Sequence, residues 1–234
     1  MKKVVDTFSF FNEKELLELR VNLLKDYVDK FVITELNYTH SGIPKPFICK
    51  ETIRELGLPE SMIDVVEISI SEEDLVPTEI DLIHSSQAGS LKSVHMWVRE
   101  RIQRDGVIHG LLELDDDVII INGDCDEMIR PDTIEYFRNI VVQNQSILKV
   151  PLVSLEGRAD KRLFHKDGNP VQWRHSLFMC TMGQLRDKSI SSFRGNTNNP
   201  YPIVWATENG EMVEDCGWHF TWMGDAARKR EKMR

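Results

Sequence analysis

Short apolar runs alternate with longer segments of mixed polarity along the first 145 residues of the chain. Runs rich in Val, Ile and Phe and bounded by polar residues are typical of strands that are buried on both faces. We therefore expect buried strands at residues 4–8, 31–33, 65–68 and 118–121.

The segments between these runs carry apolar residues at helical spacing. This spacing predicts amphipathic helices over residues 12–24 and 91–102, and Pro131 opens a further helix that runs to about residue 142. Residues 77–89 are expected to form a loop. Strands that alternate with helices predict an α/β fold with a mostly parallel central sheet flanked by helices.

The pattern changes beyond residue 146, where short apolar runs are separated by turns rich in Gly, Asn and Pro. This half is expected to contain mixed strands and loops that pack onto the first sheet. The sequence has neither an internal repeat nor a low-complexity linker. We therefore expect one domain over residues 1–234, made of the halves 1–145 and 146–234.

The most informative segment is the end of the fourth expected strand. Asn122 and Gly123 break its apolar run, and the carboxylates of Asp124, Asp126 and Glu127 follow at once. Open α/β sheets usually bind ligands at the carboxyl ends of their strands. Two aspartates that point the same way from an extended turn repel each other unless a divalent cation lies between them. The segment is thus either a metal site for a phosphorylated substrate or a solvated acidic turn.

The composition is that of a soluble globular protein and argues against nucleic-acid binding and membrane-spanning proteins. Apolar residues make up 41% and charged residues 29% of the 234 residues, as in a soluble globular protein. The net charge of −9 argues against a nucleic-acid partner. No apolar run approaches the roughly 20 residues of a membrane span, and Asp6 follows the N-terminus too closely for a signal peptide. Four scattered cysteines fit a reducing compartment, so we expect a soluble cytoplasmic protein.

Several segments, taken in order, resemble a known family. They are Val5–Glu13, Val28–Thr39, Pro44–Pro46, Asp124–Glu127 and Gly217–Trp222. Together they are similar to glycosyltransferase family 17, whose best-known members are β-1,4-mannosyl-glycoprotein β-1,4-N-acetylglucosaminyltransferases. The resemblance is weakest across residues 50–90 and 155–215.

This resemblance implies a GT-A-like nucleotide-sugar-binding fold and an enzyme that transfers a sugar with inversion at the anomeric carbon. The implied donor is a UDP-sugar, with N-acetylglucosamine as the transferred sugar, and the implied acceptor is a hydroxyl of a glycan or glycoconjugate. The implied cofactor is Mn²⁺ or Mg²⁺. In this interpretation residues 1–145 bind the nucleotide and residues 146–234 form the acceptor side.

The same resemblance implies roles for the acidic turn. Asp124 and Asp126 are the expected metal ligands, and Glu127 either orients the turn or touches the acceptor as a catalytic residue. His219 is expected to complete the metal shell, because neutral imidazole suits Mn²⁺. The alternative for His219 is a packed histidine among aromatic residues.

Three residues near strand ends are candidates for binding the nucleotide. Thr7 and Phe8 could cover the base, and Glu35 could accept a hydrogen bond from uracil or ribose. Ordinary packing at strand ends is the alternative for all three.

Arg99 and Arg104 on the helix before the acidic turn could reach diphosphate oxygens. Alternatively, Arg104 forms an i,i+4 pair with Glu100. Inverting transfer also needs a general base near the acceptor hydroxyl, for which Asp215 and Glu156 are candidates.

Two other functions stay open at this point. A sugar nucleotidyltransferase also uses paired aspartates, but such enzymes usually carry a glycine-rich, basic loop after the first strand, and residues 8–12 offer neither feature. A glycan-binding module without catalytic activity could use the same fold, and it would bind sugar without UDP or metal.

Overall fold

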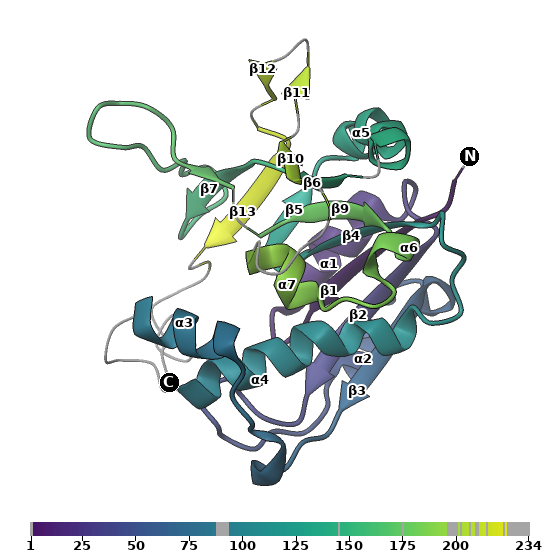
Figure 1. Ribbon diagram of the computed structural model, residues 1–234, viewed down its shortest axis with the longest axis vertical. Helices are drawn as coiled ribbons and strands as arrows, with labels where there is room; N and C mark the ends of the chain where they lie inside the picture. The colour runs from purple at the N-terminus through teal and green to yellow at the C-terminus, as the bar shows by residue number, and fades with distance from the viewer. Residues whose placement is uncertain are drawn as a thin grey trace.

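The four expected strands lie side by side in the central sheet of the computed structural model (Figure 1). The strands of this sheet are β1 (Val4–Ser9), β2 (Lys30–Leu36), β3 (Ile63–Ile68), β4 (Ile119–Asp124), β6 (Ile147–Lys149), β9 (Phe178–Thr181) and β10 (Ile203–Trp205). Their order is β10-β6-β9-β4-β1-β2-β3. The structure describes residues 2–87, 94–144, 146–174, 176–195, 201, 203–205, 207–208, 211–213, 215–221 and 223.

Within this sheet β9 alone is antiparallel to its described neighbours, β4 and β6, while the other pairs are parallel. The mostly parallel α/β class expected from the sequence is thereby confirmed. Ser9 pairs with both Thr34 and Asp124, so the carboxyl ends of β1, β2 and β4 meet at one edge. The acidic turn therefore lies at the edge of the sheet where it was expected.

Helices cover both faces of the central sheet. The helical elements are α1 (Lys14–Leu24), α2 (Cys49–Glu55), η1 (Glu60–Met62), η2 (Glu72–Asp74), α3 (Glu79–Gln87), α4 (Val94–Asp105), η3 (Gly106–Gly110), α5 (Pro131–Asn144), α6 (Met182–Leu185) and α7 (Ile190–Gly195). Alternate strand residues face opposite sides. Val4 packs with residues of α1, α2 and α5, whereas Val5 packs with residues of η3, α6 and α7. In Figure 1, α4 crosses the near face of β1 and β2.

Helix α3 corrects the prediction of a loop over residues 77–89. Its first turn is fixed by Asp81, whose carboxylate accepts hydrogen bonds from the backbone N–H and the hydroxyl of Thr78, both at 2.8 Å. Arg101 of α4 donates to the same carboxylate at 2.9 Å. The helix is thus stabilised by a cap and by a distant charge, which local apolar spacing does not reveal. The predicted start of the next helix near Leu91 lies outside the described residues.

A smaller, mixed sheet lies beside the first and takes most of its strands from residues 146–234, whereas β6, β9 and β10 of that half extend the central sheet itself. The strands of the smaller sheet are β5 (Glu127–Ile129), β7 (Leu152–Glu156), β8 (Gln172–Trp173) and β13 (Gly217–Thr221), in the order β5-β13-β7-β8, while β11 (Thr207–Glu208) pairs with β12 (Glu211–Met212). Strand β13 lies very close to β5, because a Cβ on Gly217 would be only 2.1 Å from the carbonyl oxygen of Met128. Glycine is needed at this point.

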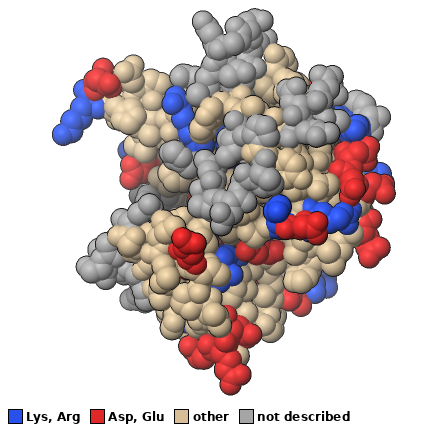
Figure 2. Space-filling view, viewed as in Figure 1, with Lys and Arg blue, Asp and Glu red and all other residues tan. Residues whose placement is uncertain are grey.

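Acidic and basic side chains are intermixed over much of the face in Figure 2, with an acidic group at its lower end over η2. The four cysteines, Cys49, Cys125, Cys180 and Cys216, are all buried and free. Among the helices that the structure describes, none is long and apolar enough to cross a bilayer.

Candidate functional site

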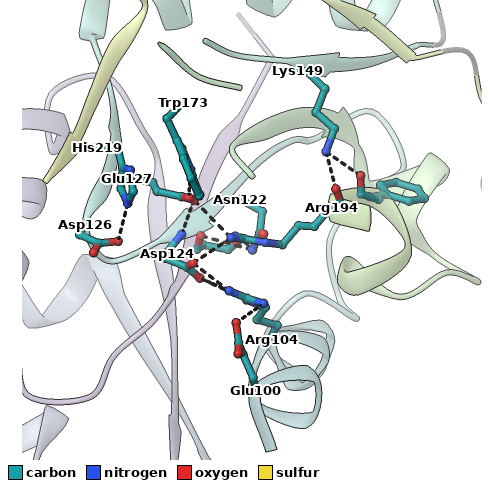
Figure 3. Close-up of polar contacts among 12 residues, drawn as sticks. Glu100, Arg104, Asn122, Asp124, Asp126, Glu127, Lys149, Trp173, Arg194 and His219 are labelled. Atoms are coloured by element: carbon teal, nitrogen blue, oxygen red, sulfur yellow. Dashed lines mark hydrogen bonds and ion pairs between the residues drawn. The ribbon is translucent and has the colours of Figure 1, made fainter. Parts of the chain in front are cut away.

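The acidic turn joins the two sheets. Asp124 ends β4 of the central sheet, and Glu127 begins β5 of the smaller sheet. In β13, His219 pairs with Glu127. Side chains from four distant segments therefore converge on this turn, as Figure 3 shows for Arg104, Trp173, Arg194 and His219.

A buried arginine binds the backbone of the acidic turn. Arg20 of α1 has no solvent exposure, and its Nε and Nη2 donate to the carboxylate of Asp6 at 2.7 and 2.8 Å. Its Nη1 donates to the backbone carbonyls of Asp124 and Glu127 at 2.6 and 2.8 Å. Burial alone would lower the pKa of Arg20, but the charge of Asp6, its hydrogen bonds to Arg20 and the nearby Cys125 and Glu127 together outweigh burial and raise it. The backbone of the turn is thus fixed by a permanent cation.

Two arginines share the carboxylate of Asp124. Arg104 of α4 donates from Nη2 at 2.8 Å and from Nε at 3.2 Å, and Arg194 of α7 donates from Nη2 at 2.8 Å. Burial alone would raise the pKa of Asp124, but the charges of Arg104 and Arg194 hold it well below its usual range. Arg104 also contacts Glu100 at 2.6 Å, which confirms the predicted i,i+4 pair.

The Glu127 carboxylate is buried and points back into the turn. It accepts hydrogen bonds from the backbone N–H of Asp124 at 2.8 Å, from Trp173 Nε1 at 2.5 Å and from Arg194 Nη2 at 3.4 Å. These contacts are those of a residue that orients the turn.

His219 lies beside Asp126, although the two residues are far apart in the sequence. Nε2 of His219 is 4.0 Å from Oδ1 of Asp126, and the two side chains are 11% and 13% exposed. The imidazole also stacks on Trp173, with ring centroids 4.4 Å apart. Both alternatives for His219 are therefore compatible with its position, because the ring is packed and one nitrogen faces the acidic turn.

The pair of Asp126 and His219 fits a divalent cation. Ligand bonds of about 2.0–2.2 Å allow one ion to contact two atoms that are 4.0 Å apart. In the part of the chain that the structure describes, no three His, Cys, Asp or Glu side chains form a metal-binding group. Such ions are often held by one or two carboxylates together with substrate phosphates. Asp124 could join the pair only by giving up contacts with its arginines.

Thr7 and Phe8 lie inside the protein, not on its surface. Thr7 Oγ1 donates to the carbonyl of Ile121 and accepts a hydrogen bond from Asn122 Nδ2, both at 2.9 Å. The buried Phe8 ring packs 4.3 Å from the guanidinium carbon of Arg20. Their side chains thus support β4 and Arg20 beneath the turn.

Glu35 fixes the start of α2. Its buried carboxylate accepts hydrogen bonds from Lys45 Nζ at 2.6 Å and from the backbone N–H groups of Ile48 and Cys49 at 3.0 and 2.9 Å. The structure thus uses this carboxylate for contacts within the chain.

Arg99 contacts the loop after β2 and, among the described residues, forms neither a hydrogen bond nor an ion pair with the acidic turn. It donates to the carbonyl of His40 at 3.3 Å and lies 3.8 Å from Glu72. Gly42, with a φ of +96°, leaves room for it, because a Cβ there would be 2.9 Å from Arg99 Nη2.

Asp215 lies just before β13, with a positive φ of 60°, and among the described residues none of its hydrogen bonds goes to a residue of the acidic turn. Its carboxylate accepts hydrogen bonds from Arg162 at 2.7 and 3.1 Å and from Gln172 at 2.9 Å. The structure therefore brings Arg104, Asp126 and His219 to the turn, but not Asp215. Trp222, at the end of the family-like segment, lies outside the described residues.

A comparison with known families places the chain in one of them. A model of glycosyltransferase family 17 matches residues 1–153, which include β1, β2 and the acidic turn. The chain belongs to glycosyltransferase family 17. This membership, together with the mostly parallel sheet, confirms the expected GT-A-like α/β class. No curated protein matches this family 17 chain.

The chain also matches solved structures with which it shares little sequence. The 4-diphosphocytidyl-2C-methyl-D-erythritolsynthase of Anaerococcus prevotii has 9% identity and a TM-score of 0.43, with 87% of each chain covered. The 2-C-methyl-D-erythritol 4-phosphate cytidylyltransferase of Francisella tularensis has 10% identity and a TM-score of 0.42, covering 88% of this chain and 90% of that one. HddC from Yersinia pseudotuberculosis has 8% identity and a TM-score of 0.47, with the same coverage.

Sequence reasoning missed three basic residues of this family 17 site. Arg20 left a weak signal, as a charged position between the apolar Leu17 and Val21 of α1. Arg194 and Lys149 left none. The buried Lys149 donates from Nζ to the carbonyls of Phe193 and Arg194 at 2.7 and 3.1 Å. Burial, aided by the charge of Arg194, lowers the pKa of Lys149 to about 7.

Proposed function

We propose that this family 17 protein is a metal-dependent, inverting glycosyltransferase. It moves N-acetylglucosamine from UDP-N-acetylglucosamine to a hydroxyl of a glycan or glycoconjugate. The proposal depends most on one observation, the approach of His219 to Asp126 on the acidic turn. Family membership supports sugar transfer, and the position of the turn at the carboxyl edge supports nucleotide binding there.

In this proposal Asp126 and His219 would hold Mn²⁺ or Mg²⁺, and Asp124 would join them by giving up contacts with Arg104 or Arg194. The bound cation supplies neutralisation of the charge that develops on the departing diphosphate. Arg20 and Glu127 keep the turn in one conformation, so the ligands need little rearrangement when the donor binds.

Inversion requires a group that removes the proton of the attacking hydroxyl. Asp215 and Glu156 are the candidates for this base from the sequence, and Glu127 is the catalytic candidate on the acidic turn. The contacts of Glu127 with Trp173 and Arg194 favour a supporting role for it. Asp215 could act as this base if the acceptor glycan extended along β13 toward Arg162.

A thermal-shift screen of UDP-, GDP- and CMP-sugars, each with and without Mn²⁺, tests donor and cofactor together. We expect stabilisation by UDP-N-acetylglucosamine that depends on the metal, because Asp126 and His219 would hold the cation that neutralises the diphosphate. Stabilisation by a glycan alone, with no response to nucleotide or metal, would instead support a binding module. Release of pyrophosphate from a nucleoside triphosphate and a sugar phosphate would support a nucleotidyltransferase.

A further inference from the structure

Arg194 has hydrogen-bonding capacity that the described protein does not use. Its side chain is only 8% exposed, and its Nη2 contacts Asp124 at 2.8 Å and Glu127 at 3.4 Å. Its Nη1 is buried and makes no hydrogen bond to any residue that the structure describes. Buried polar groups nearly always have a partner, so a buried guanidinium nitrogen without one points to a ligand.

The position of Arg194 is fixed through its backbone. Lys149 of β6 donates to the carbonyls of Phe193 and Arg194, near the end of α7. Phe193 is itself buried and packs against Phe178 of β9, with ring centroids 5.7 Å apart. Arg194 therefore projects toward the acidic turn from a rigid base, as Figure 3 shows. A binding group that is held in place in this way loses little entropy when its ligand arrives.

The neighbouring Arg104 shows the contrast. All three of its guanidinium nitrogens are engaged, Nη1 with Glu100 and the other two with Asp124. Its contacts are short on both sides, so Arg104 is committed to holding Asp124. Arg194 could instead exchange its long contact with Glu127 for a new partner.

The chemistry of that partner follows from the guanidinium. A planar fork of N–H donors matches the oxygens of a phosphate group, and arginine is favoured wherever phosphate is recognised in this geometry. Asp124 is 31% exposed in its side chain, so a ligand can approach the turn from solvent. A nucleoside diphosphate held at the turn would place its phosphate oxygens beside Arg194.

We propose that Arg194 binds the diphosphate of the donor nucleotide and stabilises it as the leaving group. This inference rests on the proposed function, because it requires a nucleoside diphosphate at the acidic turn. The two arginines then have separate roles. Arg104 positions Asp124, and Arg194 contacts the substrate.

Isothermal titration of UDP, UMP and uridine, each with and without Mn²⁺, tests the proposal with the whole chain. We expect Arg194→Gln to weaken UDP binding at least about tenfold, because a charge-assisted contact is lost. Uridine binding should stay within about twofold of the wild type, because the nucleoside does not reach Arg194. The UDP affinity of Arg194→Lys should fall between those of the wild type and Arg194→Gln, since lysine keeps the charge but not the planar pair of N–H donors.

Arg101→Gln is the matched control, because Arg101 is also a partly buried arginine that binds a carboxylate, that of Asp81, but it lies on the α3 side of α4. It should bind UDP like the wild type. Arg194→Lys also guards against misfolding, since its charge still faces Asp124 and Glu127, and the unfolding midpoint of each variant is measured first.

Unchanged UDP affinity in both Arg194 variants would overturn the inference, and so would an equal loss for UDP and uridine. Failure of the wild type to bind any nucleoside diphosphate would overturn the proposed function itself. The two failures are therefore distinguishable.

Discussion

Arg20 and Asp6 form an ion pair that is fully removed from solvent, and the same guanidinium binds two carbonyls of the acidic turn. We expect Arg20→Met to lower the free energy of unfolding by about 3–5 kcal/mol, because it leaves the Asp6 carboxylate buried and unpaired. Urea denaturation measures this loss. Arg54→Met is the control, since its pair with Glu60 is exposed and is worth no more than about 1 kcal/mol. A similar loss in both variants would contradict the role of Arg20.

Asp126→Ala should abolish UDP-sugar turnover and leave the melting temperature nearly unchanged. The carboxylate contributes to the proposed metal site, and its 4.0 Å separation from His219 is longer than a hydrogen bond. Turnover assays with Mn²⁺ and thermal unfolding measure the two effects. Asp64→Ala on β3, where Asp64 pairs with Lys30 away from the turn, should keep full activity. Retained turnover in the Asp126 variant would remove the metal role.

Lys149 should make stability depend on pH. Its pKa is about 7 in the folded protein and 10.5 ordinarily, so between these values the unfolded chain binds a proton that the folded protein does not. The contribution of Lys149 to stability therefore rises with pH across this window, by up to about 1.4 kcal/mol per pH unit.

The measurement compares the wild type with Lys149→Met by urea denaturation at pH 7, 8 and 9. The stability of the wild type relative to the variant should increase at each step. A difference that stays constant over this range would show that Lys149 keeps an ordinary pKa.

Glu35→Gln should lower the free energy of unfolding by about 1–3 kcal/mol, because Lys45 loses its charged partner and the start of α2 loses an acceptor. Denaturant unfolding and uridine titration together separate the two roles considered for Glu35. Weaker uridine binding at unchanged stability would favour the nucleotide role predicted from the sequence over the helix-capping role.

Gly217→Ala should push β13 away from β5, since the new methyl group would meet Met128 and Ile129 at 2.1 and 2.9 Å. We expect a loss of about 1–3 kcal/mol, as for overpacked cores, and weaker Mn²⁺ binding because His219 moves with β13. Denaturation and metal titration test these effects. Wild-type values in both would show that the contact between the strands can relax.

The sequence predicts the strand and the acidic turn of the site, but not most of the charged side chains that contact this turn. The apolar run of β4 and the carboxylates after it are local patterns, so the turn and its place at the sheet edge could be predicted. The role of His219 as a metal ligand is predicted only by the resemblance to the family, because no local pattern links His219 to Asp126.

The contacts of the basic residues at the acidic turn form only in the complete fold. Lys149 and Arg194 belong to segments that reach the turn only when β6 and α7 have packed, and neither has a local signal. Helix α3 was missed for the same reason, because its cap at Asp81 is completed by Arg101 from another helix.

The ligands proposed for the cation come from different sheets. Asp124 ends β4 of the central sheet, Asp126 lies in the short segment between β4 and β5, and His219 belongs to β13 of the smaller sheet. An ion held by all three side chains would act as a removable cross-link between these layers. Binding of such an ion would then restrict movement of the two sheets relative to each other at β5.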